Sequence, residues 1–227
     1  MVNRNARTAR KLIGDQTRTL ILDTAERLCA EKGFESLSVR AISDLAGVNL
    51  NAVTYHFGGK QGLFEEMFKR RVVPLNEERL ALLDAAFSNK TPPTLEDVLY
   101  AFVRPPMRLS VPEEADTGNS AIVVMQFLSR AFSMPGEEQF LGKYYEPVRS
   151  RFLVALKHCL PEVPLEEIIW RYNLMVGAII YAMGGAERME RLPQVFATTQ
   201  LHHDSDLDSL VLRFVVFFSA GFRANKE

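Results

Sequence analysis

The chain has 227 residues, of which 47% are hydrophobic and 24% charged, and its formal net charge is −1. This composition is typical of a soluble globular protein with one or two domains, and it excludes a chain that is disordered overall. The most apolar stretch, Leu174 to Met183, is too short to cross a bilayer because polar residues flank it on both sides. We therefore expect no membrane-spanning segment.

The N-terminal segment, residues 1–16, is basic. It contains Arg4, Arg7, Arg10 and Lys11, but no apolar core follows them as it would in a secretory signal. Cys29 and Cys159 lie far apart in helical apolar patterns, which favours buried free thiols over a disulfide. These features predict a cytoplasmic protein with a basic, flexible N-terminal arm.

Charge is distributed unevenly along the chain. Residues 1–71 contain 12 Lys and Arg against 8 Asp and Glu, a net +4, and the rest contain 15 against 20, a net −5. Such asymmetry favours nucleic-acid contact near the N-terminus, whereas a solvated charged tail is the plainer alternative.

Three short helices are expected after the arm. The first runs from Thr17 to Lys32, with apolar residues at Leu20, Ile21, Ala25, Leu28 and Cys29, and Gly33 stops it. The second follows an N-cap at Ser36 or Ser38 and ends at Gly47. The third, Leu50 to His56, is capped by Asn49 and closed by Gly58-Gly59.

The remaining chain is also expected to be helical. A long helix from Lys60 to about Phe87 should be interrupted or end near Pro74, and the next, from Thr94, should end near Pro105-Pro106. Three or four more are expected, roughly over residues 120–134, 137–160, 165–191 and 206–224, with a polar connection at 195–205. No alternating strand pattern is present, so the predicted fold is all-α.

Residues Ser38 to Lys60 have the pattern of a helix-turn-helix. Its apolar side consists of Ala41, Ile42, Leu45, Val48, Val53 and Phe57, and Gly47 lies where the chain must turn sharply. The outer face of the third helix then carries residues suited to base edges in a major groove, namely Asn49, Leu50, Asn51, Thr54 and Tyr55, with His56 nearby. A compact helical trio without a ligand is the plainer alternative.

Groups suited to phosphate surround that face. Ser38 and Arg40 begin the second helix and Lys60 begins the fourth, where free backbone N–H groups favour an anion. Thr17 or Arg18 opens the first helix in the same way. We expect these residues to position the protein on DNA while the third helix reads the sequence.

These residues resemble a known family. Ala46-Gly47-Val48-Asn49, the triplet Tyr55-His56-Phe57, Lys60 and Leu63-Phe64 are similar to the N-terminal DNA-binding domain of TetR-family regulators, over about Thr17 to Phe68. The common pattern has Ser at Asn49, Gly at Asn51 and Tyr at Thr54, so base contacts do not transfer directly. The resemblance implies a helix-turn-helix domain at residues 17–59 and a C-terminal helical ligand-binding and dimerisation domain at residues 60–227.

A narrower resemblance concerns the effector. Gly47 to Gly58, with Trp170-Arg171, Met175, Gly177 and Met183 to Gly185, is similar to a PsrA-type subgroup, and the C-terminal part of the likeness covers about Gly118 to Ala186. Members of that subgroup are associated with fatty-acid or acyl-chain effectors and with lipid metabolism. The resemblance therefore implies a small hydrophobic effector such as a fatty acid or acyl-CoA.

An effector pocket needs apolar walls and a few polar groups. The apolar candidates are Phe102, Met125, Phe127, Phe152, Trp170 and Met175, and the candidate donors to a headgroup are Arg104, Arg130, Arg171 and Asn173. Ordinary core packing and surface salt bridges are the alternatives for each.

The last two long helices are expected to form a homodimer interface, because both are rich in small and apolar residues. Those residues are Val176, Gly177, Ile180, Gly184 and Gly185 in one helix, and Leu210, Val211, Phe214, Val215, Phe218 and Gly221 in the other. A monomer whose terminal helices close its own core is the alternative.

No cofactor or metal is expected. His202-His203-Asp204 is better explained as a polar loop than as a metal site, and no catalytic arrangement is recognisable. The sequence thus predicts a homodimeric repressor that binds double-stranded DNA and is released by a hydrophobic ligand. The alternatives are a helical lipid-thioester enzyme and a ligand-independent architectural DNA-binding protein.

Overall fold

The computed structural model describes residues 2–89, 91–109, 121–131, 137–183 and 206–224, and this part of the chain is helical with no β-strand. The all-α prediction is thereby confirmed. The elements are α1 (Val2–Lys32), a 3₁₀ turn η1 (Phe34–Ser36), α2 (Val39–Ala46), α3 (Leu50–Phe57), α4 (Lys60–Ser88), α5 (Leu95–Arg108), α6 (Ala121–Ala131), α7 (Glu137–Phe140), a π-helical turn η3 (Leu141–Tyr145), α8 (Glu146–Cys159), α9 (Leu165–Met183) and α11 (Leu207–Arg223).

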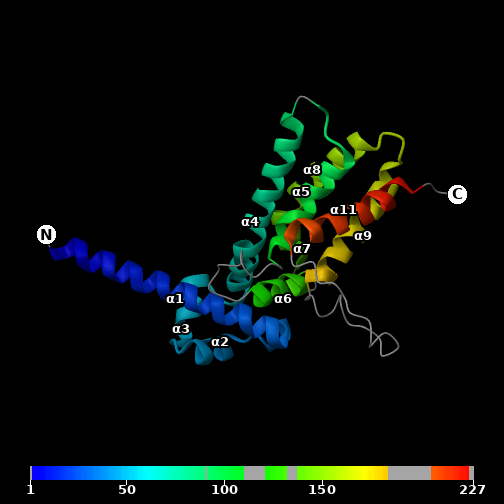
Figure 1. The fold of residues 1–227 in the computed structure, drawn as a ribbon. Coiled ribbons are helices and arrows are strands. Elements are labelled where there is room, and N and C mark those ends of the chain that lie inside the picture. The colour runs from blue at the N-terminus through cyan, green and yellow to red at the C-terminus, as the bar shows by residue number, and fades with distance from the viewer. Residues whose placement is uncertain (1, 90, 110–120, 132–136, 184–205, 225–227) are drawn as a thin grey trace.

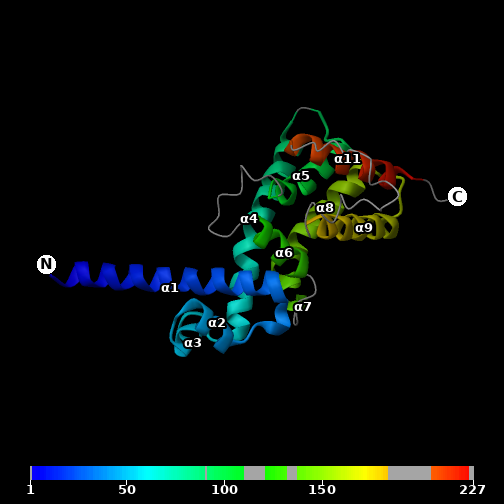
Figure 2. The same ribbon diagram turned by 60° about the horizontal axis from the view of Figure 1, so that its bottom comes forward.

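The helices form two groups joined by α4. Helices α2 and α3 lie against the C-terminal half of α1, whose N-terminal half projects away from the molecule (Figure 1). Helix α4 leaves this group and enters a second one that contains α5, α8, α9 and α11, and α6 lies between the two groups (Figure 2). The first group therefore contacts the second through α4 and α6.

Helix α1 is longer than expected. It begins at Val2 rather than at Thr17, so the segment expected to be a flexible arm continues the helix. The physical reason is composition, because residues 2–16 contain no proline, and eight of the fifteen are Arg, Ala, Lys, Leu or Gln, which favour helix. Leu20, expected on the apolar face, is 44% exposed. The division into domains otherwise stays a prediction.

Proline does not end α4 or α5 where the sequence indicated. Helix α4 continues through Pro74, and α5 contains both Pro105 and Pro106 and ends at Arg108. Pro106 has no N–H to give to the carbonyl of Phe102, and the Nε of Arg79 donates to that carbonyl instead, at 3.0 Å. A side chain from a neighbouring helix thus satisfies the acceptor that proline leaves unpaired.

The helix expected over residues 137–160 is divided in three, α7, η3 and α8. Pro147 lies in the first turn of α8, where its missing N–H removes a bond to the preceding turn. The widened turn leaves the carbonyl of Tyr144 to accept from Asn76 Nδ2 at 2.7 Å. Helix α9 is described only to Met183, so the expected continuation to residue 191 and the loop at 195–205 lie outside the described residues.

One continuous apolar core runs through both groups of helices. Phe34, after α1, has its ring centroid 5.6 Å from that of Phe64 in α4 and 6.0 Å from that of Phe127 in α6. In the second group, Phe102 packs against Phe152 at 4.9 Å and against Tyr172 at 5.3 Å. The two groups of helices therefore share one core.

Two further expectations concern the chain as a whole. Among the helices that the structure describes, none has the length and apolar character needed to span a bilayer. Cys29 and Cys159 are free thiols, as predicted, and burial raises the pKa of Cys29 to about 12.

Candidate nucleic-acid interface and ligand cavity

The turn between α2 and α3 is built by two caps and a glycine. Ser38 Oγ accepts a hydrogen bond from the N–H of Ala41 at 3.0 Å, and Asn49 Oδ1 accepts from the N–H of Asn51 at 2.8 Å. Gly47 has φ 65°, in the left-handed region that side chains disfavour. These features confirm the predicted caps and turn, and they fix α3 relative to α2.

The outward face of α3 is exposed to solvent along its length. Leu50, Asn51 and Thr54 are exposed, and Tyr55 is 84% exposed, whereas Val53 and Phe57 on the opposite side are buried. A buried inner face and an exposed polar and aromatic outer face leave the helix free to enter a groove.

His56 does not share that face. It is half-buried, and its ring centroid lies 4.9 Å from that of Tyr55 and 6.2 Å from that of Phe57. Its ring lies on the side that faces α1, where a Cβ on Gly14 would be 3.9 Å from His56 Cε1. Leu45, expected on the apolar side of the motif, is instead 63% exposed.

The predicted phosphate-binding groups lie at helix N-termini. Ser38 and Arg40 are exposed at the start of α2, where Arg40 makes only a 4.0 Å ion pair with Asp44 in solvent. Lys60 is exposed at the start of α4, with its ammonium 5.3 Å from the ring centroid of Phe64. Each position offers an anion both a side chain and free backbone N–H groups.

Thr17 and Arg18 are placed differently from the expectation. Both lie inside α1, so the prediction that one of them opens the helix is wrong. Thr17 Oγ1 donates to the carbonyl of Ile13 at 2.9 Å, and Arg18 pairs with Glu66 and lies over the ring of Phe57. Neither has free helix N–H groups beside it, and their contact with DNA stays a prediction without that support.

A buried ion pair joins α4 to the group formed by α1, α2 and α3, which we call the reading head. Glu26 in α1 is 0% exposed and accepts from Arg71 in α4 through both Nε, at 3.1 Å, and Nη2, at 2.5 Å. Arg70 adds a bond to Asp23 at 2.7 Å. Sequence reasoning missed this pair, although a charged residue in the apolar stripe of a helix, as Glu26 is, signals a buried partner.

The junction of α3 and α4 depends on glycine. Gly58 and Gly59 have φ 71° and 116°, which side chains rarely adopt. A Cβ on Gly62 would lie 1.9 Å from the carbonyl oxygen of Phe57, so the first turn of α4 packs directly on the end of α3. The predicted glycine pair is confirmed, and Gly62 is a further requirement that the sequence analysis did not identify.

A small cavity lies in the second group of helices. It has a volume of about 30 Å³, and α4, α5, α6, η3 and α9 all contribute to its walls. The lining is apolar except for Arg79 and Tyr145. Tyr145 and Tyr172 share a hydrogen bond of 2.8 Å between their hydroxyls, and burial raises the pKa of both phenols. Burial also lowers the pKa of the Arg79 guanidinium.

Comparison with known families accounts for both groups of helices. Residues 21–67 match the family described as "Bacterial regulatory proteins, tetR family". Residues 100–221, more than half of the chain, match the "Tetracyclin repressor-like, C-terminal domain". The chain belongs to the TetR family. It is therefore a regulatory protein and not an enzyme, which removes the lipid-thioester enzyme from the alternatives.

Individual relatives agree with this assignment. The chain is 32% identical to the HTH-type transcriptional regulator AcrR of Shigella flexneri over 149 residues, 64% of this chain and 65% of that protein. It is 36% identical to the HTH-type transcriptional repressor KstR2 of Rhodococcus jostii over 52 residues, 23% of this chain and 26% of that protein. The chain thus spans less than two thirds of the length of these curated relatives.

A solved structure shows the same fold. The TetR-like transcriptional regulator from Rhodococcus sp. RHA1 has a TM-score of 0.59 at 14% identity, with 92% of this chain and 97% of that one covered. Within the TetR family, then, the two-group architecture described above is shared at low sequence identity.

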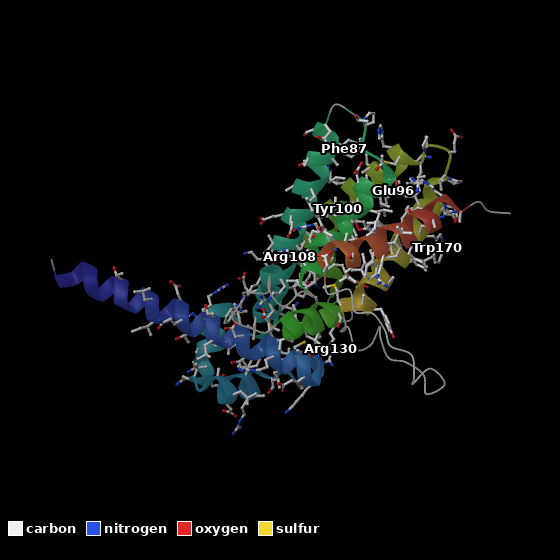
Figure 3. All side chains as sticks on the ribbon, viewed as in Figure 1. Phe87, Glu96, Tyr100, Arg108, Arg130 and Trp170 are labelled. Carbon is white, nitrogen blue, oxygen red and sulfur yellow. The ribbon has the colours of Figure 1, made fainter. Side chains whose placement is uncertain are left out.

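In this TetR-family chain, few of the predicted effector residues reach the cavity. Phe102 lines it, whereas Phe127, Phe152 and Met175 are buried elsewhere in the core. Trp170 is 61% exposed on α9 (Figure 3), and Asn173 is also exposed. The side chain of Met125 lies outside the described residues. Apolar patterns identified core positions without showing which ones border a void.

The predicted headgroup donors are occupied by other partners. Arg104 pairs with Glu78 at 3.2 Å, and Arg171 Nη1 donates to the carbonyl of Phe222 at 2.7 Å. Arg130 extends from α6 towards α1 (Figure 3), where its Nη1 donates to the carbonyl of Cys29 at 2.7 Å. The structure brings none of the three to the cavity lining, and their ligand role stays a prediction.

Some of the residues expected in the dimer interface pack inside the chain instead. Val211, Val215 and Phe218 of α11 are buried in the chain's own core. The large apolar side chains that remain exposed are Leu212, Val216 and Phe217 on α11 and Leu165, Trp170, Leu174 and Tyr181 on α9. Both faces of α11 are apolar, so periodicity alone did not show which one packs internally. Gly184 and Gly185 lie outside the described residues.

Proposed function

We propose that this protein is a sequence-specific DNA-binding transcriptional regulator, acting as a homodimeric repressor that a small hydrophobic ligand releases from its operator. The observation that carries the proposal is the outward face of α3, exposed from Leu50 to Tyr55, between the helix N-termini at Ser38 and Lys60. AcrR and KstR2 support it, since both are named transcriptional regulators and KstR2 is named a repressor.

Base and phosphate contacts come from different residues in this proposal. Asn51, Thr54 and Tyr55 present amide, hydroxyl, methyl and ring groups to base edges in the major groove. Ser38 and Lys60 hold phosphates on either side and carry no sequence preference. Asn51 and Thr54 depart from the common family pattern, so the operator differs from those of typical relatives.

A dimer supplies the second reading head. One α3 reads only a short half-site, whereas two heads related by a two-fold axis span half-sites about 34–36 Å apart. The apolar stripes on α9 and α11 support this arrangement, because isolated proteins rarely expose several large apolar side chains on adjoining helices. Leu174, 68% exposed, and Phe217, 72% exposed, are the most prominent.

Ligand control depends on α4. This helix carries Phe64 and Arg71 against the reading head and Val72, Leu75 and Arg79 against the cavity. A ligand that favours one position of α4 over another changes the spacing of the two heads, and a ligand without such a preference changes nothing. The resemblance to PsrA-type regulators supports a fatty acid or acyl-CoA as effector.

The proposal is tested by binding to DNA from beside the protein's own gene, measured by gel shift at several salt concentrations. Tyr55→Ala should change which sequences are preferred. Lys60→Ala should weaken binding to all sequences and reduce the salt slope by about one unit. If the purified protein ignores that DNA at low salt, or if both variants lose specificity equally, the proposal is wrong.

A ligand-independent architectural role is the remaining alternative. It predicts weak sequence preference and no ligand that shifts the melting temperature of the purified protein. A thermal-shift screen of hydrophobic ligands, followed by release from DNA, therefore distinguishes it from a ligand-controlled repressor.

A further inference from the structure

Arg79 is a buried cation whose hydrogen-bond partners are neutral. Its side chain is 8% exposed, its Nε donates to the carbonyl of Phe102 at 3.0 Å, and its Nη1 donates to Asn76 Oδ1 at 3.2 Å. The guanidinium carbon lies 4.0 Å from the ring centroid of Phe102. Among the described residues, no carboxylate lies within ion-pair distance of it. The nearby Glu78 is held by Arg104 at 3.2 Å and Arg108 at 3.1 Å.

A second buried arginine among the described residues, Arg71, gives a comparison because its charge is paired within the chain. Arg71, also 8% exposed, is matched by both oxygens of Glu26. A buried charge without an opposite charge is costly, and proteins normally pair it. Arg79 has the burial of Arg71 but lacks its anion, and it borders the cavity of about 30 Å³.

The cavity offers an anion a second polar group and apolar walls. The Tyr145 hydroxyl can donate or accept in its 2.8 Å bond with the Tyr172 hydroxyl. The other walls include Leu128, Val176 and Ile180. The volume accommodates roughly two water-sized groups, which suits a carboxylate head and is too small for the several oxygens of a phosphate ester.

We propose that this cavity receives the carboxylate of a free organic acid with an apolar tail, with Arg79 as counterion and the Tyr145 hydroxyl as hydrogen-bond donor. The proposal rests on the proposed function, because it names the chemical class of the effector. A coenzyme A thioester does not fit, since its carbonyl carries no charge to pair with Arg79. A tail of several carbons displaces Val176 and Ile180, which are only half-buried on α9.

The same residues connect the head of the ligand to the DNA-reading group. Tyr145 ends the π-helical turn η3, and the two preceding residues hold Glu65 near the start of α4. Lys143 Nζ donates to Glu65 Oε1 at 2.5 Å and the Tyr144 hydroxyl donates to it at 2.8 Å. A carboxylate that reorients Tyr145 therefore acts on α4 both at Arg79 and, through η3, at Glu65.

The test compares acids with uncharged analogues on the full-length protein. Isothermal titration and thermal unfolding are measured with straight-chain carboxylates from butyrate to decanoate, with octanamide and with octanoyl-CoA. We expect at least one acid to bind, and octanoate to bind about tenfold or more tightly than octanamide, as expected for a charge-assisted hydrogen bond. Equal binding of octanoate and octanamide, or binding of none of the acids, overturns the proposal.

Variants locate the site. Arg79→Gln keeps an N–H donor near Phe102 but removes the charge, and Tyr145→Phe removes only a hydroxyl; both should weaken octanoate at least tenfold. Arg104→Gln, a half-buried arginine away from the cavity lining, should bind octanoate like the wild type. If Arg79→Gln does not fold, the proposal is tested by the affinity of Tyr145→Phe for octanoate and by the comparison of octanoate with octanamide on the wild type. Unchanged affinity in a folded Arg79→Gln overturns the proposal.

DNA binding measured without any acid keeps the two proposals apart. If the protein binds its promoter DNA and no acid binds at Arg79, the effector inference fails while the DNA-binding function stands. If the protein binds no DNA at low salt, the proposed function fails whatever the acids do.

Discussion

Replacing Phe217 tests whether the apolar stripe of α11 forms the dimer interface. The side chain is 72% exposed in the isolated chain, which corresponds to about 140 Å² of a phenylalanine. Phe217→Ala removes about two thirds of that area, worth ~2 kcal/mol per copy at 25 cal/mol per Å². A two-fold interface loses the contribution twice, so the dimer should be weakened by ~4 kcal/mol, roughly a thousandfold in dissociation constant.

Sedimentation equilibrium over a range of protein concentrations measures that constant. The matched control is Val154→Ala on α8, because Val154 is 71% exposed but lies outside the proposed interface. Circular dichroism should show both variants to be folded, since neither side chain belongs to the core. A change of less than about threefold in Phe217→Ala, or an equal change in Val154→Ala, would contradict the assignment of the interface.

Three further predictions concern stability. Glu26→Ala should destabilise the protein by about 3–5 kcal/mol, because it leaves Arg71 buried and unpaired; a loss under about 1 kcal/mol in urea unfolding would refute this. Gly62→Ala should abolish DNA binding or folding, since its Cβ would overlap the carbonyl of Phe57, and wild-type affinity would count against the close approach. Arg223 lowers the pKa of Glu96 to about 2, so that pair stabilises the fold above the usual glutamate pKa and is lost as pH falls from about 4 towards 2. Both side chains are about half exposed, so the pair should contribute no more than about 1 kcal/mol to the free energy of unfolding. In Glu96→Gln this contribution should be absent, and the urea midpoint should therefore fall less between about pH 4 and pH 2 than in the wild type.

Sequence patterns predicted the elements best where the stabilising interaction joins residues that are close together in the chain. Capping by Ser38 and Asn49 and the turn at Gly47 involve residues within three positions of each other, so the sequence contains the whole interaction. Helix ends at proline were predicted less well. The carbonyl of Phe102 receives no hydrogen bond from Pro106, and the donor that replaces it is Arg79, which lies 23 positions earlier in the chain.

The same distinction applies to the candidate sites. The outer face of α3 follows from helical periodicity, and its exposure agrees with the predicted base-reading face. The cavity does not follow from periodicity, because it depends on where five helical segments leave space between them. One usable signal was overlooked twice. Glu26 and Arg79 are charged residues within the apolar stripes of their helices, and such positions indicate a partner that only the tertiary fold can supply.

The buried pair of Glu26 and Arg71 also determines how the chain can be cut and recombined. A fragment that stops at residue 59 retains Glu26 but lacks Arg71. The carboxylate of Glu26, which is 0% exposed in the whole protein, would then be either exposed to solvent or buried without an opposite charge. For a chimera that places this reading head on the body of another regulator, the junction belongs after Arg71, within α4. The transferable unit of this protein is larger than its helix-turn-helix.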